Sequence, residues 1–270
     1  MTHQRTASGM IAAERRRRIY ESALRRGSVS VSELAASLGV AQNTVRYDLD
    51  ILAREGKLVR SHGGATVKQA GLPVPPYSQI RDANMLQKSW IAAAGAEFLP
   101  ETGCVFINAG STTYQLVLRI QERHGIAVTT NSPEIALHLA LNGPVEVGLI
   151  GGEVVKDSLE TDGSLSADML ARVYWDTAFM GLSAIDPDHG ITSINLPIAT
   201  LESQVMEHSR QVIGLCDSSK LGRFSRVKVG PVSLIDVLIT DNGAKQSIVE
   251  SIESQGVQVI VAGPDSGLLA

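Results

Sequence analysis

A short run of polar side chains, residues 42–47, lies where a predicted helix would begin. Amide side chains can pair with adenine, arginine can pair with guanine, and threonine can reach a phosphate or a thymine methyl group. When such groups occupy the first turns of a helix whose other face is apolar, that helix can read base edges in the major groove of DNA. We therefore predict DNA contacts from Gln42, Asn43, Thr44, Arg46 and Tyr47.

Two further residues, Arg60 and His62, fall in a predicted hairpin, where they could contact the DNA backbone or the minor groove. Asp48 and Asp50 would repel phosphate if they faced it, so we expect them to face away or to pair with nearby arginines. Residues 1–70 hold 12 Lys and Arg against 6 Asp and Glu, whereas the rest holds 12 against 22. This asymmetry favours nucleic-acid contact by the N-terminal part alone, although a solvated charged helix would have the same composition.

A second polar group, residues 108–113, lies between a predicted strand and a predicted helix start. A glycine there lets the backbone approach a ligand, hydroxyl groups can donate hydrogen bonds, and a helix start favours an anion. An ordinary capped turn would have the same residues. From this group we predict effector contacts by Asn108, Gly110, Ser111, Thr112 and Thr113.

Polar loops also follow other predicted strands, and they contain Asn131, Gly152 and Lys220. Lys220 is a lone cation beside a strand end, suited to a phosphate or a hydroxyl group, although a surface lysine that points into water would look the same. Because the carboxyl ends of parallel strands meet at one edge of a sheet, we expect these loops to form one small-molecule site.

The first polar group needs a compact helical domain to position it. Apolar residues at helical spacing, followed by two β-prone runs around a Gly-Gly turn, predict helices at 14–27, 32–39 and 42–55 and strands at 57–60 and 65–67. Ser32 is the expected N-cap of the second helix. This order predicts a winged helix-turn-helix domain over residues 1–68.

The second polar group needs a sheet. Residues 69–76, rich in Pro, are the predicted linker, and residues 77–270 alternate apolar strands with amphipathic helices. Such alternation indicates an α/β domain with a largely parallel sheet covered on both faces. The predicted strands are 105–107, 127–129, 145–150, 177–182, 212–215, 237–239 and 257–261.

The composition favours a soluble intracellular protein. No apolar run approaches the roughly 20 residues that span a bilayer, and the arginine-rich start lacks the apolar core of a signal peptide, so we expect a cytoplasmic location. Cys104 and Cys216 lie in apolar runs and are expected to be buried free thiols. No cysteine or histidine pair has the spacing of metal ligands, so we expect neither metal nor cofactor.

Short motifs along nearly the whole chain resemble those of the DeoR family of bacterial repressors. In the first domain they are Glu14-Arg15, Ser32-Glu33-Leu34-Ala35, Leu38-Gly39-Val40, Thr44-Val45-Arg46, Asp48-Leu49, Gly56 and residues 60–65. In the second domain they include Asn108–Thr113, Thr130-Asn131, Ile150-Gly151-Gly152, Gly163, residues 176–181, Asp217–Lys220 and Leu238-Ile239-Thr240-Asp241.

The resemblance implies a repressor of a carbohydrate-catabolism operon that binds double-stranded operator DNA as a homodimer or homotetramer. It also implies a sensor domain with a fold like that of ribose-5-phosphate isomerase, which binds a phosphorylated sugar or related metabolite and is not an enzyme. The family's effector loops would map onto Gly110, Ser111, Thr112, Asn131, Gly152 and Lys220.

This chain departs from the family pattern at four places. The family commonly has Ser at the position of Ala41 and Arg at that of Tyr47, so the operator preference should differ. It often has Asp at the position of Asn108 and Lys near that of Glu202 or Ser203. A site with one cation fewer would prefer a less anionic effector or depend on its remaining lysine alone.

Two other functions compete with this interpretation. A sugar-phosphate isomerase with an appended DNA-binding head would need a carboxylate base beside the substrate carbon, and within residues 181–186 only Asp186 could supply it. A structural nucleic-acid protein would use the α/β domain for oligomerisation alone. Turnover of ribose 5-phosphate would indicate the first, and a DNA affinity indifferent to every small anion would indicate the second.

Overall fold

The computed structural model describes residues 12–26, 28–55, 57–61, 63–67, 83–120, 124–155 and 158–265. The chain divides into two compact units, Met1–Val74 and Pro75–Ala270. Each unit has its own hydrophobic core. The division falls within the predicted linker, residues 69–76, which lies outside the described residues.

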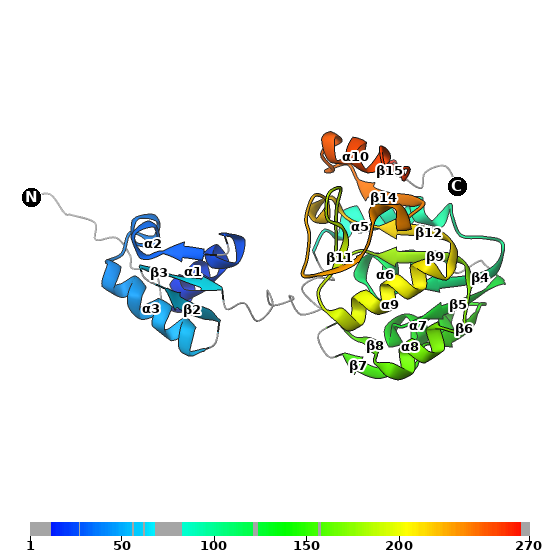
Figure 1. Cartoon of the computed structure of the whole chain (residues 1–270), viewed down its shortest axis with the longest axis horizontal. Helices are drawn as coiled ribbons and strands as arrows, with labels where there is room; N and C mark the ends of the chain where they lie inside the picture. Colours follow the sequence, from blue (N-terminus) through cyan, green and yellow to red (C-terminus); the bar gives the residue numbers. More distant parts are fainter. Residues whose placement is uncertain are drawn as a thin grey trace, which may run out of the picture. The chain divides into compact units, whose positions relative to one another are not determined.

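The described part of the N-terminal unit contains helices packed on a small antiparallel sheet (Figure 1). Its elements are α1 (Ala12–Arg26), β1 (Ser28–Ser30), α2 (Val31–Leu38), α3 (Gln42–Arg54), β2 (Leu58–Ser61) and β3 (Gly64–Val67). The strands lie in the order β1-β3-β2. The predicted winged helix-turn-helix is confirmed.

The second helix begins earlier than predicted. Its N-cap is Ser30 and not Ser32, because the Ser30 Oγ accepts a hydrogen bond of 3.1 Å from the backbone N–H of Glu33. The helix ends at Gly39, whose φ of 65° lies in the left-handed region that favours glycine. This sharp ending allows α3 to start at Gln42.

The core of this unit determines which face of α3 is exposed. Val45, Leu49 and Leu52 are at most 2 % exposed and recur every three or four residues along α3. Burying one such side chain stabilises a fold by roughly 1.5–3 kcal/mol. Most of the polar residues between them are therefore held on the outer side of the helix, whereas Asp48 is buried.

The C-terminal unit is built on a seven-stranded sheet in which every neighbouring pair is parallel (Figure 1). The strands follow the order β15-β14-β12-β9-β4-β5-β6. They are β4 (Thr102–Ile107), β5 (Gly125–Thr130), β6 (Glu146–Leu149), β9 (Trp175–Gly181), β12 (Ser209–Leu215), β14 (Val237–Asp241) and β15 (Gln258–Ala262). The predicted α/β fold with a parallel sheet is confirmed.

Helices cover both faces of this sheet. Successive residues of a strand point to opposite faces, so Val105 and Ile107 pack in one hydrophobic cluster and Phe106 in the other. One cluster includes side chains of α5 (Met85–Ala96), α6 (Ser111–Val117) and α7 (Pro133–Asn142). The other includes side chains of α8 (Ser164–Leu170), α9 (Leu196–Glu207) and α10 (Gln246–Glu253).

Two smaller antiparallel sheets, which the sequence did not reveal, lie beside the main one. One pairs β7 (Glu153–Val155) with β8 (Glu160–Asp162). The other has the order β10-β11-β13, with β10 (Ala184–Asp186), β11 (Gly190–Ser193) and β13 (Val227–Gly230). The 3-10 turns are η1 (Ser218–Lys220) and η2 (Val232–Leu234).

The two cysteines differ in their surroundings. Cys216 is buried, but Cys104 is exposed, so the prediction of two buried thiols is wrong for Cys104. Cys104 lies near the start of β4, before the strand becomes buried. Among the described residues, no helix is long and apolar enough to cross a membrane.

Candidate nucleic-acid interface and effector site

The polar side chains predicted to read DNA lie together on the outer face of α3. Gln42, Asn43, Arg46 and Tyr47 are exposed, and Thr44 is half-buried. The guanidinium of Arg46 donates to Asn43 Oδ1 at 2.7 Å and to Gln42 Oε1 at 3.3 Å. The arginine is therefore held along the helix surface by two neighbouring amides, a bonded group that sequence reasoning treated as separate contacts.

An ion pair anchors the buried side of the same helix. Asp48 is 0 % exposed, and its carboxylate accepts hydrogen bonds from Arg15 Nε at 2.5 Å and Arg15 Nη2 at 3.2 Å. Arg16 adds a contact of 3.7 Å. The hydrogen bond to Asp48 raises the pKa of Arg15. As expected from the sequence, the acid pairs with arginines, and it ties α3 to α1.

The hairpin is tied to α3 as well. Arg60 on β2 donates to Asp50 Oδ1 at 2.8 Å and to the carbonyl of Gly64 at 2.5 Å. A Cβ on Gly64 would lie 2.1 Å from the carbonyl oxygen of Val29, so this turn requires glycine. Arg60 therefore also positions the hairpin, in addition to the contact with DNA that the sequence predicts for it. The other predicted hairpin residue, His62, lies outside the described residues.

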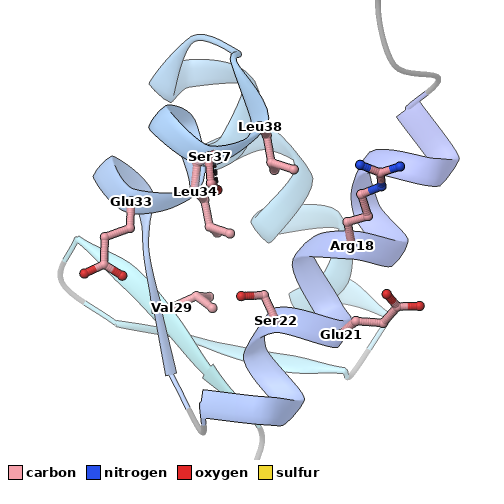
Figure 2. A pocket seen from close by; sticks show the side chains of 8 residues that line it. All are labelled: Arg18, Glu21, Ser22, Val29, Glu33, Leu34, Ser37 and Leu38. Atoms are coloured by element: carbon pink, nitrogen blue, oxygen red, sulfur yellow. Dashed lines mark hydrogen bonds between the residues drawn. The ribbon is translucent and has the colours of Figure 1, made fainter.

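A cavity of about 400 Å³ lies elsewhere in this unit, between α1, β1 and α2 (Figure 2). Apolar side chains of Val29, Leu34 and Leu38 form its floor, and Arg18, Glu21 and Glu33 stand at its rim. None of its lining residues belongs to α3. The cavity is therefore separate from the polar face of the third helix.

In the C-terminal unit, the predicted effector residues gather at the carboxyl ends of the parallel strands, as expected. Asn108 follows β4, Asn131 follows β5, and Lys220 ends the 3-10 turn after β12. Several of these side chains, however, already bond to the protein. Asn108 accepts from the Gly181 N–H at 2.7 Å and donates to the Gly181 carbonyl at 3.0 Å, which joins the ends of β4 and β9.

Thr113 and Asn131 are engaged in the same way. The Thr113 hydroxyl lies 2.8 Å from the Asn108 carbonyl and 2.9 Å from the Gly110 carbonyl, which closes the turn before α6. Asn131 accepts from the backbone N–H of Ala109 at 2.8 Å. These side chains shape the loop, while Gly110 is left half-exposed beside the buried Ser111 and Thr112.

Close packing leaves no room for a side chain at Gly152. Its φ is 151°, and a Cβ there would lie 2.3 Å from Ser166 Oγ and 2.4 Å from the Asp162 carbonyl. The Ser166 hydroxyl in turn donates to the Gly151 carbonyl at 2.6 Å. This glycine therefore lets the loop after β6 approach β8 and α8 closely.

Lys220 is the cation of this edge that reaches solvent. Its side chain is 28 % exposed, and its Nζ lies 3.2 Å from the Leu182 carbonyl and 3.9 Å from Asp217 Oδ2. Asp217 is itself fixed by hydrogen bonds from Asn84 Nδ2 at 3.1 Å and from the Ser219 N–H at 3.2 Å. The ammonium group is thus oriented, while part of the side chain remains exposed to solvent.

The sequence marked Glu202 only as a departure from the family pattern, and it predicted neither the burial of Glu202 nor that of Glu160. Burial raises the pKa of Glu202 to about 8, and the charge of Glu160 raises it further. Burial also raises the pKa of Glu160, whose Oε2 accepts from Asn131 Nδ2 at 3.0 Å. The signal for Glu202 was present, because it lies four residues after Ile198 and three before Val205, on the apolar face of α9.

Asp186 is the acid that an isomerase reaction would require, and its carboxylate is held by hydrogen bonds within a turn. Its Oδ1 accepts from the N–H groups of Asp188 and His189 at 3.0 Å each and lies 2.8 Å from His189 Nδ1. Burial acts to raise its pKa, but these hydrogen bonds outweigh burial, and the pKa is lowered. A carboxylate held this way is a poor general base.

Comparison with known proteins identifies both units. The N-terminal residues 15–70 match the model of the DeoR-like helix-turn-helix domain, and residues 83–242 match that of the DeoR C terminal sensor domain. The chain is 30% identical over 253 residues to a putative aga operon transcriptional repressor of Escherichia coli O157:H7, covering 93% of this chain and 94% of that protein.

A second relative is the HTH-type transcriptional regulator GlpR of Haloferax volcanii, 34% identical over 93% of this chain and 98% of that protein. Among solved structures, ribose 5-phosphate isomerase A of Methanocaldococcus jannaschii matches 51% of this chain and 55% of its own with 14% identity and a TM-score of 0.39. A likeness of that size supports no conclusion about activity.

Proposed function

This chain belongs to the DeoR family of DNA-binding transcriptional regulators, and from that premise we propose that it represses a carbohydrate-catabolism operon until a small effector binds. The effector we propose is a phosphorylated sugar or a related metabolite. The observation that carries the proposal is the presence of two distinct polar surfaces. One is the exposed face of α3, and the other is the carboxyl edge of the sheet with its accessible Lys220.

On DNA, we assign the reading role to Gln42, Asn43, Thr44, Arg46 and Tyr47. Arg46 fits a guanine edge, since a guanidinium can donate two parallel hydrogen bonds to it. Arg60 supports contact of the hairpin with the DNA backbone, and the same role is proposed for His62. Tyr47, 64 % exposed where relatives commonly carry a charge, would add an apolar contact in place of an ionic one.

In the sensor, we assign effector contacts to the turn at residues 108–113 and to Asn131, Gly152 and Lys220. Lys220 would bind the anionic group, and the backbone of Gly110, Ser111 and Thr112 would line the site. Asn108, Thr113 and Asn131 support this loop through their own hydrogen bonds. Effector binding would then shift the population between DNA-competent and DNA-incompetent states by its difference in affinity for the two.

We also propose that the protein acts as a homodimer or homotetramer in the cytoplasm, where its DNA lies. One α3 helix reads one half-site, so a two-fold operator needs two copies. Apolar surface for such contact is available on α7, where Leu137 is 62 % and Leu141 is 73 % exposed beside the edge strand β6. Sedimentation of Leu141→Asp tests this surface, with Leu196→Asp, 67 % exposed on α9, as the matched control.

A DNA-release titration tests the proposed function. The full chain is bound to the intergenic DNA upstream of its own gene, and the complex is challenged with sugar phosphates, free sugars and polyols while fluorescence anisotropy is followed. We expect one phosphorylated compound to release the DNA at micromolar concentration. DNA binding that no compound changes would contradict the sensing role and leave the DNA-binding role intact.

A further inference from the structure

Two buried carboxyl groups lie near the carboxyl edge of the sheet. Glu160 on β8 is 6 % exposed, and Glu202 on α9 is 5 % exposed. The charged and polar groups that act on the Glu202 carboxyl are Glu160, Lys220 and Ser193, the last on β11. Four separate elements therefore converge on one polar cluster.

This cluster is continuous with the proposed effector loop. Asn131 uses both ends of its amide, accepting from the Ala109 N–H at 2.8 Å and donating to Glu160 Oε2 at 3.0 Å. On the other side, Lys220 Nζ is held 3.2 Å from the Leu182 carbonyl. Asn131 therefore links the Glu160 carboxyl to the loop at residues 108–113, and the charge of Lys220 acts on the Glu202 carboxyl.

Within this cluster, Ser193 has only a poorly formed hydrogen bond. Its side chain is 0 % exposed, and its Oγ makes no hydrogen bond of normal geometry to any described residue. The hydroxyl nevertheless lies beside the Glu202 carboxyl, whose pKa it lowers. Because the contact between Ser193 and Glu202 is not of normal hydrogen-bond geometry, a ligand that offers Ser193 a well-formed hydrogen bond would be stabilised at this place.

The protonation of the two acids follows from their surroundings. Burial, followed by the charge of Glu160, raises the pKa of Glu202 to about 8, against the opposing influence of Ser193 and Lys220. Two neighbouring carboxyl groups in a buried site do not readily ionise together. Near neutral pH Glu202 therefore keeps its proton and can donate a hydrogen bond, while the Oε2 atom of Glu160 accepts one from Asn131.

We propose that Glu202 and Glu160 act as a carboxylic acid and a carboxylate that bind two adjacent hydroxyl groups of the effector, while Lys220 binds its anionic end. The acid donates to one hydroxyl group, and the carboxylate accepts from the other. The proposal rests on the effector site of the proposed function and adds a ligand class, a vicinal diol that carries one anionic group. An effector with an ammonium group would instead require both acids to be ionised.

Calorimetric titration of the full chain tests this class with matched pairs of ligands. The probes are ribose 5-phosphate against 2-deoxyribose 5-phosphate and glucose 6-phosphate against 2-deoxyglucose 6-phosphate, with inorganic phosphate as the baseline. At pH 7 we expect a diol to bind at least about tenfold more tightly than its deoxy partner, because the acid pair would otherwise lack a partner. From pH 7 to pH 9 the affinity for the diol should fall by about tenfold, since Glu202 loses its proton.

The variant Glu202→Gln tests whether binding of the diol depends on the proton of the Glu202 carboxyl. Glutamine keeps a donor and an acceptor at all pH values, so at pH 9 this variant should bind the diol about tenfold more tightly than the unmodified chain. Glu207→Gln, an exposed change on the same helix, should follow the unmodified chain at both pH values. If Glu202→Gln does not fold, carbon-13 NMR of the unmodified chain gives the same test by titrating the Glu202 carboxyl.

Several results would overturn the proposal. They are equal binding of the diol and deoxy compounds, binding by no compound of the panel, no difference at pH 9 between Glu202→Gln and the unmodified chain, or a Glu202 carboxyl that titrates near pH 4.5. Failure of the proposed function would look different. In that case the diol binds with the expected selectivity, but anisotropy shows no release of DNA.

Discussion

The two functional regions of this protein use polar residues in opposite ways. The polar side chains predicted to read DNA on α3 are mostly exposed, and Arg46 bonds to its neighbours Asn43 and Gln42 on the same helix. At the carboxyl edge of the sheet the polar side chains are mostly buried and bond to the backbone, as Asn108 does with Gly181. A surface that meets a large polyanion can stay open to water, whereas a site for a small molecule must be shaped before the molecule arrives.

This difference changes what a substitution measures. A residue on the open face can be removed at little cost to folding, so its loss reports binding. A residue in the closed network also supports the loop, so its loss mixes folding with binding. Each substitution therefore needs a matched control variant that separates folding from binding.

Asp48, which is buried on α3, is the exception to the rule that polar residues of this helix can be removed at little cost to folding. In Asp48→Asn, Arg15 and Arg16 lose their counter-charge, and we expect the N-terminal unit to lose about 3–5 kcal/mol of unfolding free energy, as for other buried pairs with one partner removed. The exposed pair of Asp50 with Arg60 is the control, and Asp50→Asn should cost less than about 1 kcal/mol.

The two tryptophans make this measurement specific. Trp90 and Trp175 both lie in the C-terminal unit, so their fluorescence follows that unit alone in urea, while far-ultraviolet circular dichroism follows both. Asp48→Asn should shift the dichroism transition and leave the fluorescence transition in place. Equal losses for the two aspartates would show that the buried pair does not hold α3.

Glu202 tests the closed network through its dependence on pH. The folded chain keeps this proton up to about pH 8, whereas an ordinary glutamate loses it near pH 4.5, so between these values the folded state binds more protons. The stabilising contribution of the Glu202 carboxyl is therefore fully present below pH 4.5. Between pH 4.5 and about pH 8 the unfolding free energy falls by about 1.4 kcal/mol for each pH unit. Glu202→Gln should therefore gain roughly 3 kcal/mol relative to the unmodified chain by pH 8, somewhat less than the full shift because buried sites relax.

Urea unfolding at pH 4, 6 and 8, followed by tryptophan fluorescence, measures that gain. The difference between Glu202→Gln and the unmodified chain should be small at pH 4 and largest at pH 8. Parallel profiles would mean that the Glu202 carboxyl titrates normally and that the cluster is open to water.

Lys220 combines features of both regions, since the Leu182 carbonyl and the Asp217 carboxylate orient its ammonium group while its side chain is partly exposed to solvent. Removing a charge-assisted hydrogen bond costs about 1.5–3 kcal/mol, so Lys220→Ala should weaken effector binding by about 10- to 150-fold. Its operator affinity should be unchanged. Lys228→Ala, an exposed change on β13, is the control. Weakening of DNA binding by Lys220→Ala alone would argue that this lysine has a structural role.

The sequence predicted the open face better than the closed site for a physical reason. The 3.6-residue period of α3 places Val45, Leu49 and Leu52 inward, so the outward residues follow directly. At the sheet edge, Glu160 and Glu202 come from elements far apart in sequence, and β8 was not predicted at all. Glu202 could have been found from its place on the apolar face of α9, but its neighbour Glu160 could not, because no local period marks it.

The reading role of Arg46 is the finest test of the open face. Losing a bidentate contact with guanine costs about 1–3 kcal/mol, so Arg46→Ala should weaken operator binding by roughly 5- to 150-fold without changing the thermal midpoint or effector binding. Arg54→Ala, an exposed change on the last turn of α3, should cost less and act equally on all DNA sequences. Because Asn43 and Gln42 hold Arg46 in place, Asn43→Ala should weaken binding less than Arg46→Ala and should add little to it in the double variant. Fully additive losses in anisotropy titrations would show that the amide contacts DNA independently, and that the bonded group seen on α3 separates when DNA binds.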